Sequence, residues 1–214
     1  MGTYAAVVLA GGAARRMGGV DKPALPVGGR PMRDRVLAAV TDATPRVLVG
    51  AADAVPAGVL VVREDPPGGG PVAAAAAGLA LLDPDTSLVA LLAADLPLLT
   101  GAAIGDLLNH LDGETPDIDP ARGGLGGERR PDGACFVDGD GRRQSLCGVW
   151  RVAALRAAVD RLTVERGGSL AGAPVRALLA GLVVREVAWS GEGPPPWFDC
   201  DTDEDVRRAE EWAR

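Results

Sequence analysis

The sequence has few aromatic residues, almost no lysine and almost no histidine. Four Trp, two Phe and one Tyr are its only aromatic residues among 214, and Lys22 is the only lysine among 22 basic residues. In a chain that otherwise uses arginine, this lysine either survives by chance or serves where a compact ammonium on a flexible stem is needed. The only histidine, His110, lies late in a predicted helix, far from any Ser or Cys motif, so we expect it at the surface.

Cysteine and long apolar runs are also scarce. Cys135, Cys147 and Cys200 are widely spaced and form no Cys-x-x-Cys pair, which excludes a disulfide framework and a zinc site. No basic segment follows Met1, and the longest apolar run, around residues 87–94, is far shorter than a membrane span. We therefore expect a soluble cytoplasmic protein that makes no contact with a membrane.

The charge balance is acidic. The 22 basic and 29 acidic residues give a net charge of −7. Binding to a phosphate backbone needs an excess of basic residues, so we do not expect this protein to bind nucleic acid. With 47% apolar and 24% charged residues, the composition is that of a folded globule, and the length favours one domain over residues 1–214.

The first half of the chain alternates between short apolar runs and helical stretches. Runs of this kind predict strands buried on both faces, as in a parallel sheet, and the alternation is typical of βαβ units. The predicted strands are 4–9, 46–49, 58–62 and 87–93, and the predicted helices are 31–40, 71–82 and 100–111, the last capped by Thr100.

The second half indicates a mixed sheet. Residues 133–137 and 146–150 flank the turn 138–141 and predict an antiparallel hairpin, after a loop over 112–132. Further helices are predicted at 152–162 and 174–182, a strand at 183–187 and a loop at 190–196. Thr202 and Asp205 have the spacing of a capping box that opens a last helix.

A Gly-rich loop follows the first predicted strand and carries three cations in eight positions. Glycine lets successive N–H groups form a cradle for an anion, and Arg and Lys neutralise the charge that it holds. The segment has neither the P-loop nor the G-x-G-x-x-G spacing. Its candidate nucleotide-binding residues are Leu9, Ala10, Gly11, Gly12, Arg15, Arg16 and Lys22.

This loop resembles the signature of sugar-nucleotide-type nucleotidyltransferases, and its segment 15–22 is most similar to molybdenum cofactor guanylyltransferases. The resemblance extends along the whole chain. It implies an α/β, single-domain, Rossmann-like nucleotidyltransferase fold with a mostly parallel mixed central sheet flanked by helices. It also implies a nucleotide-binding part at 1–111 and an acceptor-binding part at 133–214. Lys22, Arg16 and Asp95 are then the expected catalytic residues.

Asp95 follows a buried strand, at the end where open α/β sheets bind ligands. The segment 95–97 resembles the family's Asp-x-Pro metal motif, and Mg²⁺ needs only one or two carboxylates beside phosphate oxygens. The acidic pair 64–65 before Gly70 and Pro71 is similar to the family's acidic residue and Gly-Pro-Leu-Ala-Gly, which makes Asp65 and Gly70 candidates for binding the nucleoside.

The segment from Phe198 to Asp205 resembles the family's C-terminal acidic segment, with Asp203 in place of a proline. Asp201 is the candidate second metal ligand; Asp199 is the alternative, and a purely structural turn is the other interpretation. Gly50 stands where related enzymes often have Asn, and Ala74 stands where the family usually has Gly. Residues 144–146 weakly resemble a Gln-Pro-Leu segment beside the acceptor pocket.

The resemblance implies an Mg²⁺-dependent transfer of GMP from GTP to molybdopterin, with release of pyrophosphate and transient contact with enzymes that accept the cofactor. The acceptor phosphate is already an anion, so this reaction needs little acid–base catalysis. Two alternatives stay open from the sequence. One is a transferase of the same fold with another nucleotide, such as CTP, or another phosphorylated acceptor. The other is a nucleotide-binding protein without turnover.

Overall fold

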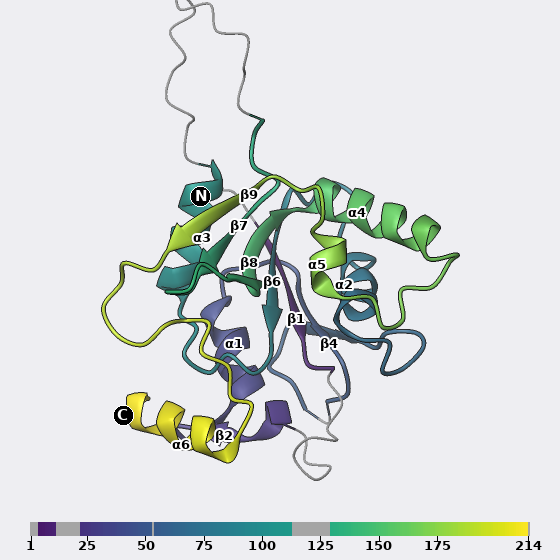
Figure 1. Cartoon of the computed structure of the whole chain (residues 1–214). Helices are drawn as coiled ribbons and strands as arrows, with labels where there is room; N and C mark the ends of the chain where they lie inside the picture. The colour runs from purple at the N-terminus through teal and green to yellow at the C-terminus, as the bar shows by residue number, and fades with distance from the viewer. Residues whose placement is uncertain (1–3, 12–21, 53, 113–128, 214) are drawn as a thin grey trace, which may run out of the picture.

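A central sheet of seven strands organises the part of the chain that the computed structural model describes, residues 4–11, 22–52, 54–112 and 129–213 (Figure 1). In spatial order the strands are β5 (Val59–Val62), β4 (Arg46–Val49), β1 (Ala5–Leu9), β6 (Leu88–Ala93), β8 (Arg143–Arg151), β7 (Gly133–Val137) and β9 (Val184–Ala188). All five residues of β1 are buried, because this strand is covered on both faces and flanked by β4 and β6.

The strands run in one direction except for β8. β1 pairs in parallel with β4 and β6, and β4 pairs in parallel with β5. β8 is antiparallel to both β6 and β7, and β7 is parallel to β9. The carboxyl ends of β1, β4, β6, β7 and β9 consequently meet at one edge of the sheet.

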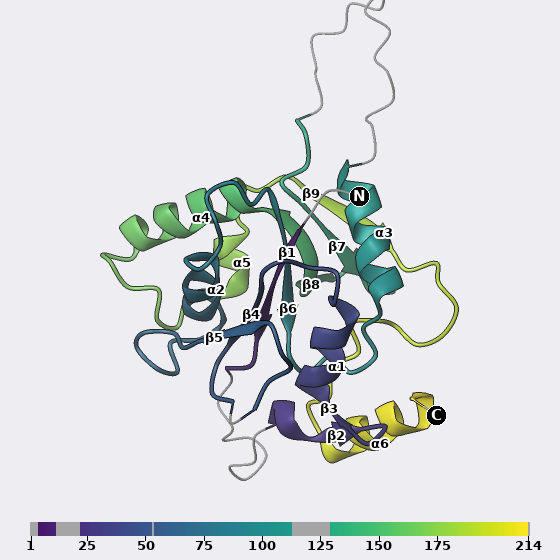
Figure 2. The same ribbon diagram turned by 180° about the vertical axis from the view of Figure 1, so that it is seen from behind.

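Helices cover both faces of the sheet (Figures 1 and 2). One face carries α1 (Met32–Ala39) and α3 (Gly101–Asp112), and the other carries α2 (Pro71–Leu79), α4 (Val152–Glu165) and α5 (Val175–Leu178). Near the carboxyl edge lie a short 3-10 helix, η2 (Lys22–Ala24), a small hairpin of β2 (Pro26–Val27) and β3 (Arg30–Pro31), and the last helix, α6 (Asp203–Trp212).

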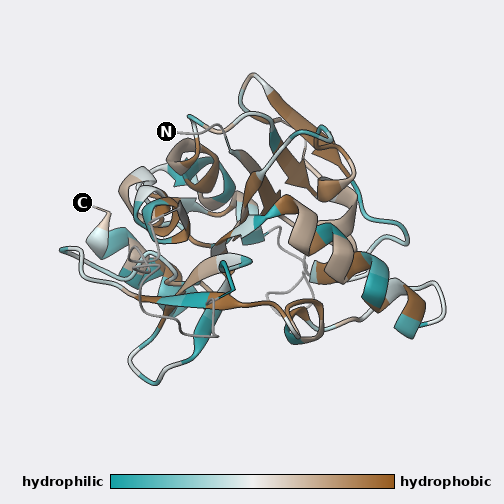
Figure 3. Ribbon diagram, turned by 90° about the horizontal axis from the view of Figure 1, so that it is seen from above, coloured by the Kyte–Doolittle hydropathy of each residue, from teal (hydrophilic) through white to brown (hydrophobic). Residues whose placement is uncertain are grey.

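The alternation of side chains along β1 divides the core into two layers. Ala6 and Val8 pack on the α1–α3 side, whereas Val7 and Leu9 pack on the α2–α4 side. The view from above shows this arrangement as apolar central strands between helices (Figure 3). A third, smaller cluster of Val27, Met32, Leu98, Cys200 and Ala209 joins α6 to the hairpin and to α1.

The structure confirms the α/β class, the predicted strands to within one residue at most of their ends, and the hairpin of β7 and β8. The helix predicted at 174–182 is wrong in extent: α5 ends at Leu178, and the chain then turns through Gly181 at φ 83°. The pattern also failed to predict β2 and β3, because Pro26 and Pro31 argue against strands.

Within the described ranges, no helix has the length and apolar character that a bilayer crossing requires.

Candidate active site

Asp95 stands at the carboxyl edge, two residues after the last residue of β6. The backbone around it is fixed on both sides. The N–H of Ala94 donates to the carbonyl of Leu9 (3.0 Å), and Nε of Arg35 donates to the carbonyl of Pro97 (2.7 Å). The Asp-x-Pro segment is therefore anchored to β1 and to α1, and its carboxylate has a defined position. Sequence reasoning had not singled out Arg35 for this role.

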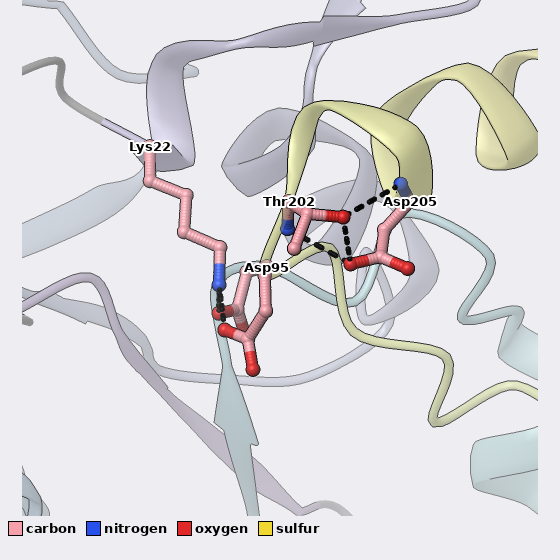
Figure 4. A network of polar contacts seen from close by, with 5 residues as sticks. Lys22, Asp95, Thr202 and Asp205 are labelled. Carbon is pink, nitrogen blue, oxygen red and sulfur yellow. Dashed lines mark hydrogen bonds and ion pairs between the residues drawn. The ribbon is translucent and has the colours of Figure 1, made fainter. Parts of the chain in front are cut away.

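Lys22 reaches this carboxylate from η2. Its Nζ donates to Oδ2 of Asp95 at 2.6 Å and to Oδ1 of Asp201 at 2.7 Å. Figure 4 shows the extended lysine side chain pointing at Asp95. Three of the residues predicted from the sequence, at positions 22, 95 and 201, are thus brought together from distant parts of the chain.

Electrostatics at this cluster follow from partial burial and the excess of carboxylates. Burial lowers the pKa of Lys22, but the ion pairs with Asp201 and Asp95 outweigh burial and leave that pKa above its ordinary value. Partial burial and the neighbouring Asp201 carboxylate raise the pKa of Asp199. Lys22 therefore stays charged throughout the physiological pH range, with its ammonium held against two anions.

The C-terminal segment places Asp201. The N–H of Cys200 donates to the carbonyl of Asp95 (3.3 Å), and the Cys200 side chain is fully buried beneath α6. Thr202 then caps α6: its hydroxyl accepts from the N–H of Asp205, whose carboxylate accepts from the N–H of Thr202 (Figure 4). The predicted capping box is confirmed, and it fixes the residue next to Asp201.

The two carboxylates fit a divalent cation. They already hold a cation, the Lys22 ammonium, at hydrogen-bonding distance, and carboxylate oxygens are the protein ligands that Mg²⁺ prefers. No group of three or more potential metal-binding side chains occurs in the described part of the chain. Such a cation would therefore need oxygen atoms from a ligand, such as phosphate, to complete its coordination.

The Gly-rich loop begins beside this cluster. The N–H of Ala10 donates to the carbonyl of Val49 (2.8 Å), so the loop leaves β1 along the end of β4. Gly50, at φ 144°, lies so close that a Cβ there would stand 2.9 Å from the carbonyl carbon of Ala10. This close approach leaves no room for a Cβ at position 50 in this backbone arrangement. The predicted residues Gly12, Arg15 and Arg16 lie outside the described residues.

The acidic pair after β5 divides into one buried and one exposed residue. Glu64 is buried, with its carboxylate against Gly11, whereas Asp65 is exposed. Gly70, at φ 92°, occupies the N-cap position of α2, a backbone conformation that favours glycine, and Pro71 follows at the first helical position. The acidic residue that lies against the start of the Gly-rich loop is thus Glu64, the neighbour of the predicted Asp65.

A second polar group lies at the same edge, where β8 begins. Nε2 of Gln144 donates to Oδ2 of Asp138 (3.1 Å) across the β7–β8 turn. Because β8 runs opposite to its neighbours, its first residues lie beside the carboxyl ends of β6 and β7. The segment 144–146, which the sequence linked to an acceptor, therefore belongs to the site's edge of the sheet.

A mostly parallel, mixed α/β sheet binds ligands at its carboxyl edge, and here that edge carries a glycine-bearing loop, a lysine and two aspartates. The class defined by this fold and site is that of Rossmann-like nucleotidyltransferases. Within it, the chain belongs to the family of MobA-like NTP transferase domains, whose family model matches residues 6–182.

A curated relative supports the assignment to this family. The chain is 31% identical, over 220 residues, to a molybdenum cofactor guanylyltransferase of Bradyrhizobium sp. (strain ORS 278), a match that covers 97% of this chain and 92% of the relative.

Two solved structures share the fold. One is the molybdopterin-guanine dinucleotide biosynthesis protein A of Archaeoglobus fulgidus (TM-score 0.64, 18% identity, 96% of each chain). The other is the 2-C-methyl-D-erythritol 4-phosphate cytidylyltransferase of Thermus thermophilus (TM-score 0.66, 19% identity, 99% of each chain).

Proposed function

We propose that this protein transfers GMP from GTP to the terminal phosphate of molybdopterin, with Mg²⁺ as the metal cofactor and pyrophosphate as the leaving group. The observation that carries the proposal is the contact of Lys22 with Asp95 and Asp201 beside the start of the Gly-rich loop. The named activity of the Bradyrhizobium relative, which matches nearly the whole chain, supports the choice of guanylyl transfer.

In this proposal the Gly-rich loop and Lys22 bind the triphosphate. Backbone N–H groups of the loop that follows Leu9 and Ala10 cradle the phosphates, and Arg15, Arg16 and Lys22 neutralise their charge. Negative charge grows on the pyrophosphate as its bond to the α-phosphorus breaks, and fixed cations lower the energy of that state. Catalysis is then chiefly alignment and charge neutralisation, with Lys22, Arg16 and Asp95 as catalytic residues.

Asp95 and Asp201 are the proposed metal ligands, with Asp199 as the neighbouring alternative. Bound there, Mg²⁺ would supply positive charge to the phosphate oxygens. The protein supplies two carboxylates whose backbone is fixed by Arg35 and Cys200, so the ligand oxygens need little rearrangement. Asp65 and Gly70 are proposed to contact the nucleoside, and residues 133–214 to bind the acceptor.

The acceptor attacks with an oxygen of its own phosphate, which is ionised at neutral pH. A general base is therefore unnecessary, in keeping with a cluster built from Lys and Asp. The chain must instead hold the attacking oxygen in line with the departing pyrophosphate. Gln144 and its neighbours at the start of β8 are suited to this, since they lie at the same edge as Asp95.

The alternative within the same class is transfer of another nucleotide, such as CMP, or to another phosphorylated acceptor. The cytidylyltransferase of T. thermophilus shares the fold, but at 19% identity the likeness concerns the fold alone. Binding without turnover is the alternative from another class. Location in the cytoplasm and transient contact with cofactor-accepting enzymes stay predictions.

The test is base exchange with purified protein. We expect Mg²⁺-GTP and molybdopterin to give the guanine dinucleotide and pyrophosphate about a hundredfold faster than ATP, CTP or UTP give their products. Equal rates with all four nucleotides, or a preference for CTP, would reject guanylyl transfer. GTP binding in a thermal-shift assay without pyrophosphate release would favour the binding protein.

A further inference from the structure

Three separate segments bring Lys22, Asp95 and Asp201 together, and all three are tied to the small hairpin of β2 and β3. Lys22 opens η2, which leads directly into β2. Its carbonyl accepts from the N–H of Leu25 (3.0 Å), and the carbonyl of Leu25 accepts from the N–H of Met32 (3.0 Å). The chain from η2 to α1 is therefore one connected unit, and the hairpin within it fixes the backbone from which Lys22 reaches the two carboxylates.

Arg35 of α1 ties this hairpin to the segment of Asp95. Its Nε donates to the carbonyl of Pro97 (2.7 Å), and its Nη1 donates to the carbonyl of Val27 in β2 (3.3 Å). The guanidinium also lies against Gly28, where a Cβ would stand 3.0 Å from Nη1. A single, half-buried guanidinium thus sets the distance between the Asp95 segment and the hairpin.

Glu210 ties the same hairpin to the segment of Asp201. The N–H of Gly28 donates to Oε1 of Glu210 in α6 (2.9 Å), and α6 begins at Asp203, two residues after Asp201. Figure 2 shows the hairpin between α1 and α6. Apolar packing joins the same segments but has no preferred direction, so the hydrogen bonds decide their placement. The residues of this cluster are Val27, Met32, Leu98, Cys200 and Ala209.

We propose that Arg35 and Glu210 are positioning residues that hold Lys22 against its two carboxylates. They act through backbone atoms of the hairpin, at Val27 and Gly28, where the three segments are joined. This inference rests on the proposed function, because it specifies what keeps the charged groups of that function in place. A misplacement of about 1 Å caused by a distant substitution can cost about a hundredfold in rate, so such positioning matters for turnover.

The experiment uses the fact that Lys22 carries the only side-chain amine of the protein. Its ammonium donates to two carboxylates and must leave them before it reacts with an acyl reagent such as an N-hydroxysuccinimide ester. The rate of acylation, followed by peptide mass spectrometry without nucleotide, therefore measures how often the contact opens. Arg35→Met and Glu210→Ala should each accelerate acylation at least about threefold. Asp201→Asn, which removes the charge of one partner, is the positive control.

Arg156→Met is the matched control for Arg35→Met. Arg156 also donates to two backbone carbonyls of another segment, those of Leu79 (3.2 Å) and Leu82 (2.7 Å). These carbonyls lie at the end of α2 that leads back to the start of β6, away from the carboxyl edge. Arg156→Met should lower thermal stability as Arg35→Met does, yet leave acylation of Lys22 within about twofold of the wild type.

Glu211→Ala is the matched control for Glu210→Ala, because it removes the same charge from the exposed, adjacent residue of α6. It should leave acylation within about twofold of the wild type. Glu210 is itself partly exposed, so its variant keeps the proposal testable even where Arg35→Met fails to fold. In the transferase assay, Arg35→Met should lower kcat at least about tenfold while KM for GTP stays within about threefold.

Each unfavourable result has a distinct meaning. Unchanged acylation of Lys22 in Arg35→Met and Glu210→Ala would overturn the positioning role. Equal acceleration in the two matched controls would also overturn it, because it would show a general loosening of the fold. Faster acylation with an unchanged kcat would overturn the role in the reaction. A wild type without transferase activity but with the expected acylation pattern would reject the proposed function and leave the positioning of Lys22 standing.

Discussion

Replacing Lys22 with methionine should create a tighter cation site in the nucleotide-free protein. The substitution keeps the length of the side chain but removes its charge from between Asp95 and Asp201, which lie 2.6 and 2.7 Å from Nζ. Both carboxylates then lose the ammonium from which they accept hydrogen bonds. In the wild type, by contrast, an added divalent cation must displace or share space with the ammonium.

The magnitude follows from the charges and their exposure. Two unit charges about 4 Å apart interact by about 1 kcal/mol in bulk water and about 4 kcal/mol at an effective dielectric constant near 20. The side chains of Lys22 and Asp95 are 19% and 24% exposed, but that of Asp201 is 64% exposed, so screening by water keeps the effect toward the lower value. We expect Mn²⁺ to bind Lys22→Met at least about tenfold tighter than the wild type, which corresponds to about 1.4 kcal/mol.

Electron paramagnetic resonance of Mn²⁺ without nucleotide measures this affinity directly. Lys22→Arg, which keeps the charge, should remain near the wild type. Arg143→Met is the matched control, since it frees Glu186 from an exposed ion pair at 2.7 Å and changes the net charge equally. Unchanged Mn²⁺ affinity in Lys22→Met, or an equal gain in Arg143→Met, would refute a cation site at these carboxylates.

The Lys22→Met variant should lose at least about a hundredfold in transferase activity, because the triphosphate loses a fixed cation. Asp95→Asn should lower both turnover and its dependence on Mg²⁺; a normal Mg²⁺ titration would place the metal elsewhere. Gly78→Ala should lower the free energy of unfolding by about 1–3 kcal/mol, measured by denaturant titration, because a Cβ at this position of α2 overlaps Val7 in the core; an unchanged midpoint would contradict that. Burial raises the pKa of Cys147 and Cys200 to about 12, so a thiol reagent at pH 8 should react slowly with the native protein and rapidly after unfolding. Fast reaction in the folded state would show that these thiols are accessible.

The framework of the sheet could be predicted because its signals are local. Apolar runs that end at glycine or acidic residues predicted β1 and β5, and the spacing of Thr202 and Asp205 predicted the start of α6. Each of these signals depends on side chains only a few residues apart. The position of Asp95 at the carboxyl edge followed from the strand before it in the same way.

The arrangement within the site could not be predicted, since it depends on contacts between distant segments. Nothing local indicates that Lys22 meets Asp201, or that Cys200 bonds to the backbone of Asp95. The pair 64–65 is a clear case. Both residues are acidic and follow the same strand. Their difference in environment depends on the backbone turn after that strand, which places Glu64 against Gly11 and leaves Asp65 exposed to water.

The ion pair between Lys22 and Asp201 joins residues 179 positions apart, so the site combines a segment that is synthesised early with one that is synthesised late. On the ribosome, β1, β4 and β6 can associate as soon as the first half of the chain has emerged, because they pair with one another in parallel. Asp201 is synthesised later, after all the strands of the central sheet. A chain interrupted before α6 can therefore possess the central strands and Asp95 while lacking the second carboxylate that contacts Lys22.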